Sequence, residues 1–207
     1  EFLQYGKHRD YYNEIISRIE VFTVAGQLNS LISAKEKNGE AGLTKAIPQV
    51  LGRLEELYKE YNPDVDKKLF TVLMEMFDRN QDENLISKEL NQQAGKAGGY
   101  AQLAEQLYAA SSLDEGEKIL KDLKSDPSGF LEAHKKDPLN ELFTALSGTY
   151  SNKVSKRLSE LQAGINKLQR VYMQAQQEVF RERTFYPDAN STLRVTFGKA
   201  KGYNPRD

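Results

Sequence analysis

One stretch of the sequence, DRNQDENLISKE, carries oxygen-bearing side chains at a spacing suited to a calcium ion. Asp78, Asn80, Asp82 and Glu89 stand at positions one, three, five and twelve of an EF-hand loop, and the last would bind through both carboxylate oxygens. Position six, where the loop turns sharply and favours glycine, holds Glu83, and the sequence has no second loop of this kind. The pattern therefore favours a solvated acidic turn between two helices, with a single EF-hand-like calcium-binding protein as an alternative.

The sequence offers little for catalysis. Its two histidines are His8, near the N-terminus, and His134, in EAHKKD, which is typical of a solvated helix end; neither lies in a metal-binding spacing such as HExxH. No serine lies in a GxSxG elbow, and AGKAGG lacks the spacing of a phosphate-binding loop, which favours a hinge. The absence of cysteine excludes disulfides, thiolate catalysis and cysteine-ligated zinc. The residues alone therefore predict no active site, no resident metal and no cofactor.

Composition and charge are those of a globular domain. The chain has 207 residues, of which 39% are apolar and 29% charged, enough to bury a core. Lys and Arg total 29 against 30 Asp and Glu, and a net charge of −1 gives no general attraction to nucleic acid or acidic lipid. No apolar run approaches the ~20 residues that a membrane span needs. Because the first residue is Glu1 rather than Met, we expect a piece of a longer protein.

Helical periodicity dominates most of the chain. Asp10 is expected to cap a helix that runs to about Lys37 and stops at Gly39, and a second helix is expected to begin near Pro48. The tripeptide NPD at residues 62–64 ends that helix and can cap the next. Further helix starts are expected at Asp114 and Asp126.

The last predicted helix carries a seam of apolar residues that repeats every seven positions. Such a seam predicts a long helix that packs lengthwise on a partner helix. An antiparallel helix of the same chain is the favoured partner, and a dimeric coiled coil is the second choice. The seam residues are Val154, Leu158, Leu161, Ile165, Leu168, Tyr172, Ala175 and Val179.

The pattern then changes to a period of two. In STLRVTF, Leu193, Val195 and Phe197 alternate with polar residues, which predicts a β-strand with one buried face. One or two strands alone are marginal in water. We therefore predict a mainly α, multi-helix domain with a long C-terminal helix, followed by one or two strands whose sheet lies outside these residues.

The terminal stretch FYPDANSTLRVTFGKAKGYNPRD resembles the segment that follows the helical domain in bacterial dipeptidyl-peptidases of the type 7 and type 11 group, serine peptidase family 46. Three earlier stretches, SSLDEGEKILKDL, KDPLNELFTAL and LQRVYMQAQQEVF, are similar to the end of that family's helical domain and come in the same order. The resemblance is close from about Ser111 to the end. Over residues 1–99 only the helical character agrees.

The resemblance implies an architecture and an activity. Family members carry a Ser, His and Asp triad on a chymotrypsin-like double β-barrel, an inserted α-helical domain covers the cleft, and dipeptides are removed from the free N-terminus of peptides. Residues 1–184 then correspond to the inserted cap and residues 185–207 to the start of the returning barrel. The family's nucleophile stretch, of the Gly-Asn-Ser-Gly type, does not occur here. No catalytic residue is carried over, and this fragment alone is expected to be inactive.

The resemblance also implies partners and a location. The expected partners are the β-barrel domains of the parent chain and a peptide substrate, and the expected location is periplasmic or cell-surface. Asp188 and Asn190, where the lid would meet the barrel, are candidate substrate-binding residues, although bonding to their own backbone in a turn is the favoured role. The alternative is a stand-alone helical interaction module, with a homodimer through the last helix among its forms, but such a module has no use for an orphan strand.

Overall fold

The structure is a computed structural model that describes residues 1–82, 84–85, 87–186, 195, 197–199 and 201–202. The regular elements among these residues are all helices, which confirms the mainly α prediction. The chain divides into two units, residues 1–163 and 164–207. None of the helices in the described part of the chain has the length and apolar content to cross a membrane.

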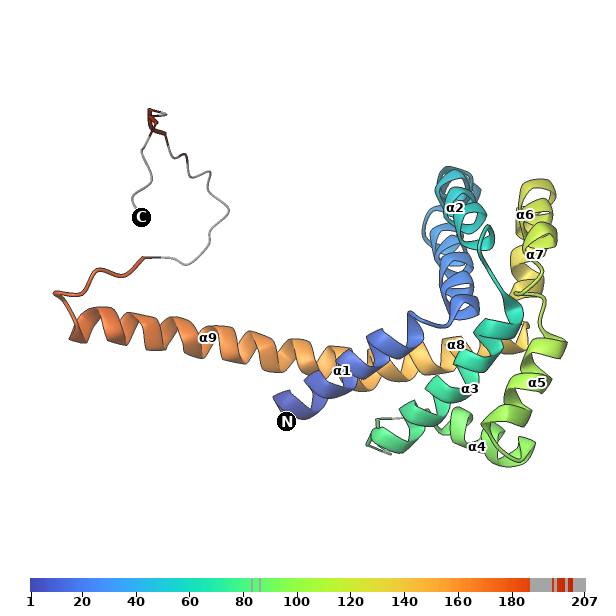
Figure 1. Ribbon diagram of the computed structural model, residues 1–207, viewed down its shortest axis with the longest axis horizontal. Coiled ribbons are helices and arrows are strands. Elements are labelled where there is room, and N and C mark those ends of the chain that lie inside the picture. The colour runs from blue at the N-terminus through green and yellow to red at the C-terminus, as the bar shows by residue number, and fades with distance from the viewer. Residues whose placement is uncertain (83, 86, 187–194, 196, 200, 203–207) are drawn as a thin grey trace. The chain divides into compact units, whose positions relative to one another are not determined.

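The second helical segment, α2 (Glu20–Tyr58), is a hairpin rather than one rod. Its two arms, residues 20–38 and 40–58, lie side by side in Figure 1. Gly39 makes the reversal with φ 64° and ψ −159°, a backbone conformation that only glycine adopts without strain. Gly42 lets the arms close, because a Cβ there would lie 2.5 Å from the carbonyl oxygen of Ala34. The predicted end of the first helix at Gly39 is confirmed. The second helix was expected to begin near Pro48, but the second arm already begins at residue 40.

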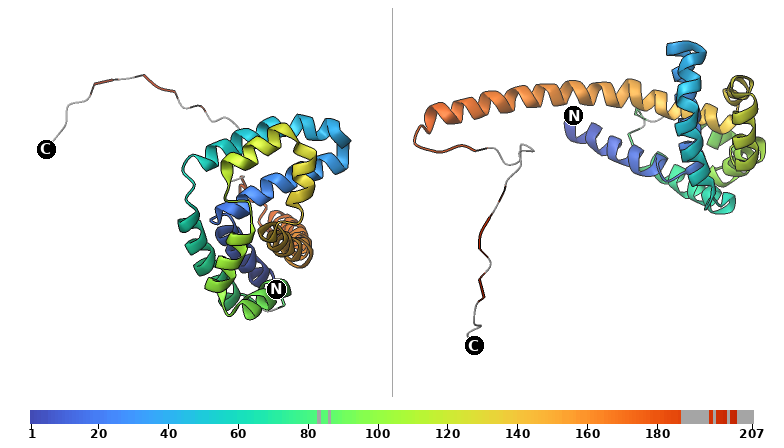
Figure 2. Two further views of the ribbon diagram at one scale, coloured as in Figure 1. Left: turned by 90° about the vertical axis from the view of Figure 1, so that its right-hand side faces the viewer. Right: turned by 90° about the horizontal axis from the view of Figure 1, so that it is seen from above.

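The other helices of residues 1–163 pack against this hairpin or against one another. α6 (Gly116–Ser125) and α7 (Pro127–His134) lie beside the hairpin, and α8 (Pro138–Thr149) contacts it from below (Figures 1 and 2). α3 (Pro63–Asn80) packs on α5 (Tyr100–Ala110), and the short α4 (Lys88–Ala97) contacts both α5 and α8. α1 (Phe2–Ile16) lies against α3.

Aromatic and aliphatic side chains from these helices form one core. Phe22 of the hairpin meets Phe70 of α3 edge to face, and the Phe70 ring meets Tyr108 of α5 in the same way. Arrangements of this kind stabilise a core beyond the apolar area that they bury. The largest fully buried side chains are Ile19, Phe22, Leu28, Leu31, Leu43, Leu54, Phe70, Met74, Phe77, Leu90 and Leu113.

The start of α2 differs from the predicted helix of residues 10–37. Asp10 lies inside α1, which ends at Ile16, and α2 starts after Ile19, whose side chain makes no capping bond. The cap comes instead from Asp66 of α3. Its carboxylate oxygens accept hydrogen bonds from the backbone N–H groups of Glu20 at 2.7 Å and Val21 at 3.2 Å. A tertiary contact therefore divides what the sequence pattern presents as one helix.

The predicted helix caps elsewhere are confirmed in part. Asn62 accepts from the N–H groups of Asp64 and Val65 at the start of α3, with Pro63 as the first helical residue. Asp126 accepts from Gly129 N–H at the start of α7. Asp114 does not cap, since α6 follows Glu115.

The long C-terminal helix is confirmed as α9 (Lys156–Val179), which follows a π-helical turn, η1 (Tyr150–Ser155). Tyr150 of this turn stacks on Tyr12 of α1, with ring centroids 4.1 Å apart. The seam is buried only at its beginning, at Val154 and Leu158. Leu168, Tyr172 and Val179 are 70%, 66% and 71% exposed, and the antiparallel intrachain partner of this part of the helix stays a prediction.

The predicted strand in residues 193–197 lies mostly outside the described residues. Val195 and Phe197 are described; neither is in a strand, and both side chains are exposed.

The Gly42 contact gives a first prediction. Gly42→Ala is expected to lower the free energy of unfolding by about 1–3 kcal/mol, because the added methyl group would force the two arms of the hairpin apart. Gly52→Ala is the matched control in the second arm, where a Cβ meets no atom within 4 Å. That variant is expected to be more stable by about 0.5–1 kcal/mol. Urea unfolding of both variants measures the difference, and equal effects would contradict the close approach.

The Asp66 cap gives a second prediction. Asp66→Ala leaves two backbone donors and the Tyr108 hydroxyl, which donates to Asp66 at 2.8 Å, without an acceptor. The expected loss of unfolding free energy is about 2–4 kcal/mol. Asp64→Ala, an exposed change in the same helical turn, is the control and is expected to cost well under half as much. Similar losses for both would show that the α2 terminus does not depend on Asp66.

Candidate functional site

The three residue types of a serine-protease triad meet at one place in the structure. Ser111 follows α5, His134 ends α7, and Asp137 precedes α8; the contact between α5 and α8 brings the serine to the other two. The Asp137 carboxylate accepts from the Ser111 hydroxyl at 2.8 Å and from Ser112 N–H at 3.0 Å. It also caps α8 by accepting from Leu139 N–H and Asn140 N–H.

The order of these contacts is wrong for nucleophilic catalysis. In a triad the imidazole lies between serine and aspartate, takes the serine proton and is oriented by the carboxylate. Here the serine hydroxyl donates directly to the carboxylate, and His134 Nε2 has no hydrogen-bond partner. The arrangement can terminate one helix and start another, but it cannot activate Ser111.

His134 belongs to the core rather than to a solvated helix end, which corrects the sequence prediction. Its side chain is 4% exposed and its ring stacks on Phe130. Burial lowers the pKa of His134 from 6.5 to about 4, against the smaller opposite effect of Asp137. A cavity of about 290 Å³ is lined by His134, Phe130, Ile119 and Asp137, among others. Nε2 itself is shielded from solvent, so the imidazole is not presented as a ligand.

His8 is likewise buried and does not form a base with a nucleophile. It lies in α1 with its ring 5.5 Å from that of Phe77, and its Nδ1 has no hydrogen-bond partner. Burial lowers its pKa from the usual 6.5, while a contact with Gln81 and the charge of Asp82 act in the opposite direction. Both histidines of the chain are thus neutral core residues at neutral pH.

The predicted calcium residues are not brought together around a common point. Asn80 lies in the last turn of α3 and donates to Met76 O, so it is part of a helix rather than of a loop. The Asp82 carboxylate accepts from Gln4 and from Asn84 N–H, and Glu89 accepts from the Ser87 hydroxyl at 2.6 Å. Asp78 also lies in α3. Within the described residues, no group of three or more His, Asp or Glu side chains is placed to hold a metal ion.

Asp188 and Asn190, the candidate substrate contacts, lie outside the described residues. The described residues close by are Arg183 and Phe185, whose guanidinium and ring lie 5.4 Å apart.

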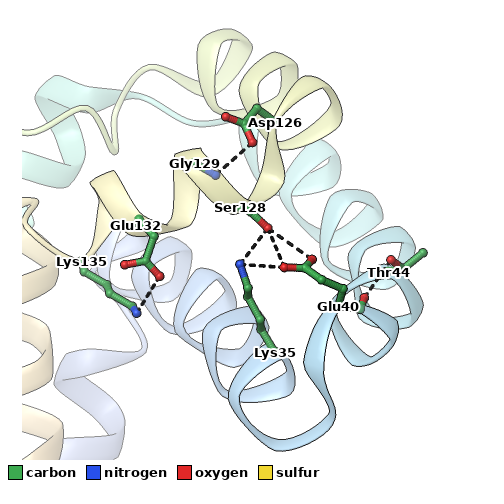
Figure 3. Close-up of polar contacts among 8 residues, drawn as sticks. All are labelled: Lys35, Glu40, Thr44, Asp126, Ser128, Gly129, Glu132 and Lys135. Atoms are coloured by element: carbon green, nitrogen blue, oxygen red, sulfur yellow. Dashed lines mark hydrogen bonds and ion pairs between the residues drawn. The ribbon is translucent and has the colours of Figure 1, made fainter.

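A polar cluster that the sequence did not single out ties the hairpin tip to α7 (Figure 3). Lys35 of the first arm forms an ion pair with Glu40 of the second at 2.9 Å, and its ammonium donates to the Ser128 hydroxyl at 2.8 Å. Ser128 in turn contacts both oxygens of Glu40 at 3.3 Å. The hydrogen bond from Lys35 keeps the pKa of Glu40 below its usual value. The cluster depends on the hairpin, because the reversal of the chain at Gly39 places Glu40 beside Lys35.

These observations define a helical domain in which neither histidine is placed to activate a serine. The family model of Peptidase S46 matches residues 3–207. The chain therefore belongs to the Peptidase S46 family.

Curated relatives agree with this assignment. An Asp/Glu-specific dipeptidyl-peptidase of Flavobacterium psychrophilum is 29% identical over 208 residues, which cover 100% of this chain and 28% of the relative. A protein of the same name from Capnocytophaga gingivalis is 29% identical, over 99% of this chain and 31% of that protein. Dipeptidyl-peptidase 7 of Porphyromonas gingivalis is 27% identical, over 91% of this chain and 25% of that protein. The chain thus spans less than a third of the length of the relatives it matches.

The depressed pKa of His134 gives a third prediction. The imidazole stays neutral in the folded protein down to about pH 4, whereas in the unfolded chain it binds a proton below about 6.5. The unfolded state therefore binds more protons across this window, and the free energy of unfolding falls as pH decreases from 7 to 4. The full effect of His134 is about 3 kcal/mol.

His134→Gln is expected to remove most of this dependence. The measurement is urea unfolding of the wild-type and variant chains between pH 7 and pH 4. Groups common to both proteins cancel in the difference, which isolates His134. Parallel pH profiles for the two proteins would contradict a neutral, buried His134.

Proposed function

We propose that this chain is the helical cap domain of a dipeptidyl-peptidase that removes dipeptides from the free N-terminus of peptides. The observation that carries the proposal is the combination of a family match over residues 3–207 with coverage of only about 28% of the matched peptidase. The described residues of this part are helical and contain no serine activated by histidine. In the proposal, the Ser, His and Asp triad lies on a chymotrypsin-like barrel elsewhere in the parent chain.

The physical role of such a cap follows from exopeptidase chemistry. An enzyme that removes two residues from an N-terminus must stop internal chain from passing through its cleft. A cover over the cleft closes the far side and leaves room for two residues. By excluding water it also lowers the local dielectric, which strengthens the attraction between the substrate ammonium group and its acceptors.

The contacts in residues 1–163 support a rigid cover. Buried carboxylates hold two of its helix starts, since Asp66 caps α2 and Asp137 caps α8. The cluster of Lys35, Glu40 and Ser128 fixes the hairpin tip on α7. A cover held by hydrogen bonds of this kind keeps its shape when a peptide enters, so that it excludes a longer chain.

Residues 185–207 are proposed as the start of the returning barrel, which makes the barrel domains of the parent chain the main partner of residues 1–184. Within this segment Asp188 and Asn190 remain candidates for contact with the peptide, and a backbone-bonded turn remains the favoured role for both. The proposed location of the parent protein is periplasmic or cell-surface.

The names of the relatives suggest which substrates to test. Two of the three relatives described above are Asp/Glu-specific dipeptidyl-peptidases, and the third is a dipeptidyl-peptidase 7. The panel should therefore contain dipeptidyl amides that end in Asp or Glu and others that end in an apolar residue.

The fourth prediction concerns activity. The full-length protein is expected to release the fluorophore from dipeptidyl amides, and the 207-residue chain assayed beside it is expected to release none, because the proposed triad lies outside it. The same amides with an acetylated N-terminus are the matched control and are expected to resist cleavage. Cleavage of the acetylated substrates would contradict an exopeptidase, and a folded full-length protein that cleaves no member of the panel would contradict the peptidase proposal.

A further inference from the structure

One side of α3 carries a line of apolar side chains that are exposed to solvent. The side that faces the core consists of four buried residues, Asp66, Phe70, Met74 and Phe77. On another side lie four apolar residues, spaced by four, three and four positions and 40% to 56% exposed, which we call the α3 stripe: Val65, Leu69, Val72 and Met76. The outward side of a surface helix is normally polar, so the α3 stripe indicates a further contact.

A groove lies beside the α3 stripe, between α3 and α5, two helices that Figure 1 shows next to each other. It has a volume of about 640 Å³, and Val72 belongs to both the groove and the stripe. Thr71 and Ala101 line the groove with short side chains, which lets another backbone approach closely. The charged residues of its lining are two of each sign, and Lys67 and Glu105 form an ion pair at 3.0 Å. A partner of the groove therefore needs no net charge.

The stripe and the groove together fit an amphipathic helix. Residues spaced by three and four positions form the face that one helix presents to another, and a helix laid in a groove is held through such positions. A strand presents side chains to one face at every second residue, which does not match this spacing. The surface therefore fits a helix whose own apolar face repeats at three and four positions.

The size of the surface favours a partner from the same chain. Four side chains that are about half exposed offer an apolar area of a few hundred Å² at most, whereas a stable interface between separate proteins buries about 800 Å² on each partner. A segment of the same chain is already tethered, so its binding costs less translational and rotational freedom and a smaller contact suffices. Most of the length of the relatives lies outside the matched region, which is only 28% of the Flavobacterium psychrophilum peptidase.

We propose that the α3 stripe and its groove bind an amphipathic helix of the parent protein that lies outside residues 1–207. The inference rests on the part of the proposed function in which this chain belongs to a longer protein, and it adds a helical contact to the proposed contact with the barrel. In the full-length protein the stripe is then buried, whereas in the 207-residue chain it is exposed.

The reactivity of a thiol at position 72 tests this difference. The chain has no cysteine, so Val72→Cys places a single thiol in the stripe, at a site that is 56% exposed. Its reaction with a maleimide, followed by mass spectrometry of the peptide that contains it, is expected to be at least about tenfold slower in the full-length protein than in the 207-residue chain. Ser33→Cys, at an exposed position of the hairpin, is the matched control and is expected to react at the same rate in both proteins. Equal rates at position 72 in the two folded proteins would overturn the proposal.

Photo-crosslinking identifies the partner. Benzoylphenylalanine in place of Val72 in the full-length protein is expected to cross-link to one segment outside residues 1–207 whose apolar residues are spaced by three and four. A cross-link between two copies of residues 1–207 would overturn the proposal in favour of a second copy, and a cross-link to a segment with alternating apolar residues would overturn the helix.

Peptidase activity measured on the same full-length protein separates this inference from the proposed function. An active protein whose thiol at position 72 reacts freely would contradict the helical contact alone. An inactive, folded protein with a protected thiol would contradict only the peptidase proposal.

Discussion

The carboxylate of Asp66 is the contact on which most of this fold depends. It is 1% exposed and accepts three hydrogen bonds, from two N–H groups at the start of α2 and from the Tyr108 hydroxyl of α5. Burial raises its pKa, while these donors act to lower it. One side chain thus fixes where the hairpin begins and joins α2, α3 and α5. The buried carboxylate is tolerated because it accepts hydrogen bonds from three groups. Without it, these buried donors would lack an acceptor, which also costs free energy.

The position of the hairpin determines the other polar contacts of residues 1–163. Once α2 begins at Glu20, the reversal at Gly39 brings Glu40 next to Lys35, and both reach Ser128 of α7. The end of α7 then leads into Asp137, which caps α8 and holds the end of α5 through Ser111. Helix termini are where backbone groups lack partners, and this chain satisfies several of them with carboxylates from neighbouring segments. Such ties oppose bending, as the proposed cover over a cleft requires.

Local signals in the sequence were sufficient for the mainly α class, for the stop at Gly39 and for the caps at Asn62 and Asp126, because each depends on residues close in the chain. The start of α2 could not be predicted, since Ile19 carries no capping group and the carboxylate that caps the helix instead, that of Asp66, lies 46 residues after Glu20. The burial of His134 was missed because EAHKKD is polar, whereas in the structure the imidazole stacks on Phe130 and lies in the core. The calcium alternative required a loop that includes Asn80, and this residue lies in the last turn of α3, a position that depends on how far the helix continues.

Residues 164–207 carry two apolar patterns that the described part of this chain leaves exposed. The seam of α9 repeats with a period of 3.5, and Val195 and Phe197 belong to an alternation with a period of two. Burial of apolar surface stabilises a protein by about 25 cal/mol per Å², and surface left in water does not make this contribution. Two such patterns next to each other are therefore better explained by contacts with other protein surfaces than by the stability of this segment itself. Their periods differ because a helical partner and a sheet partner present different spacings.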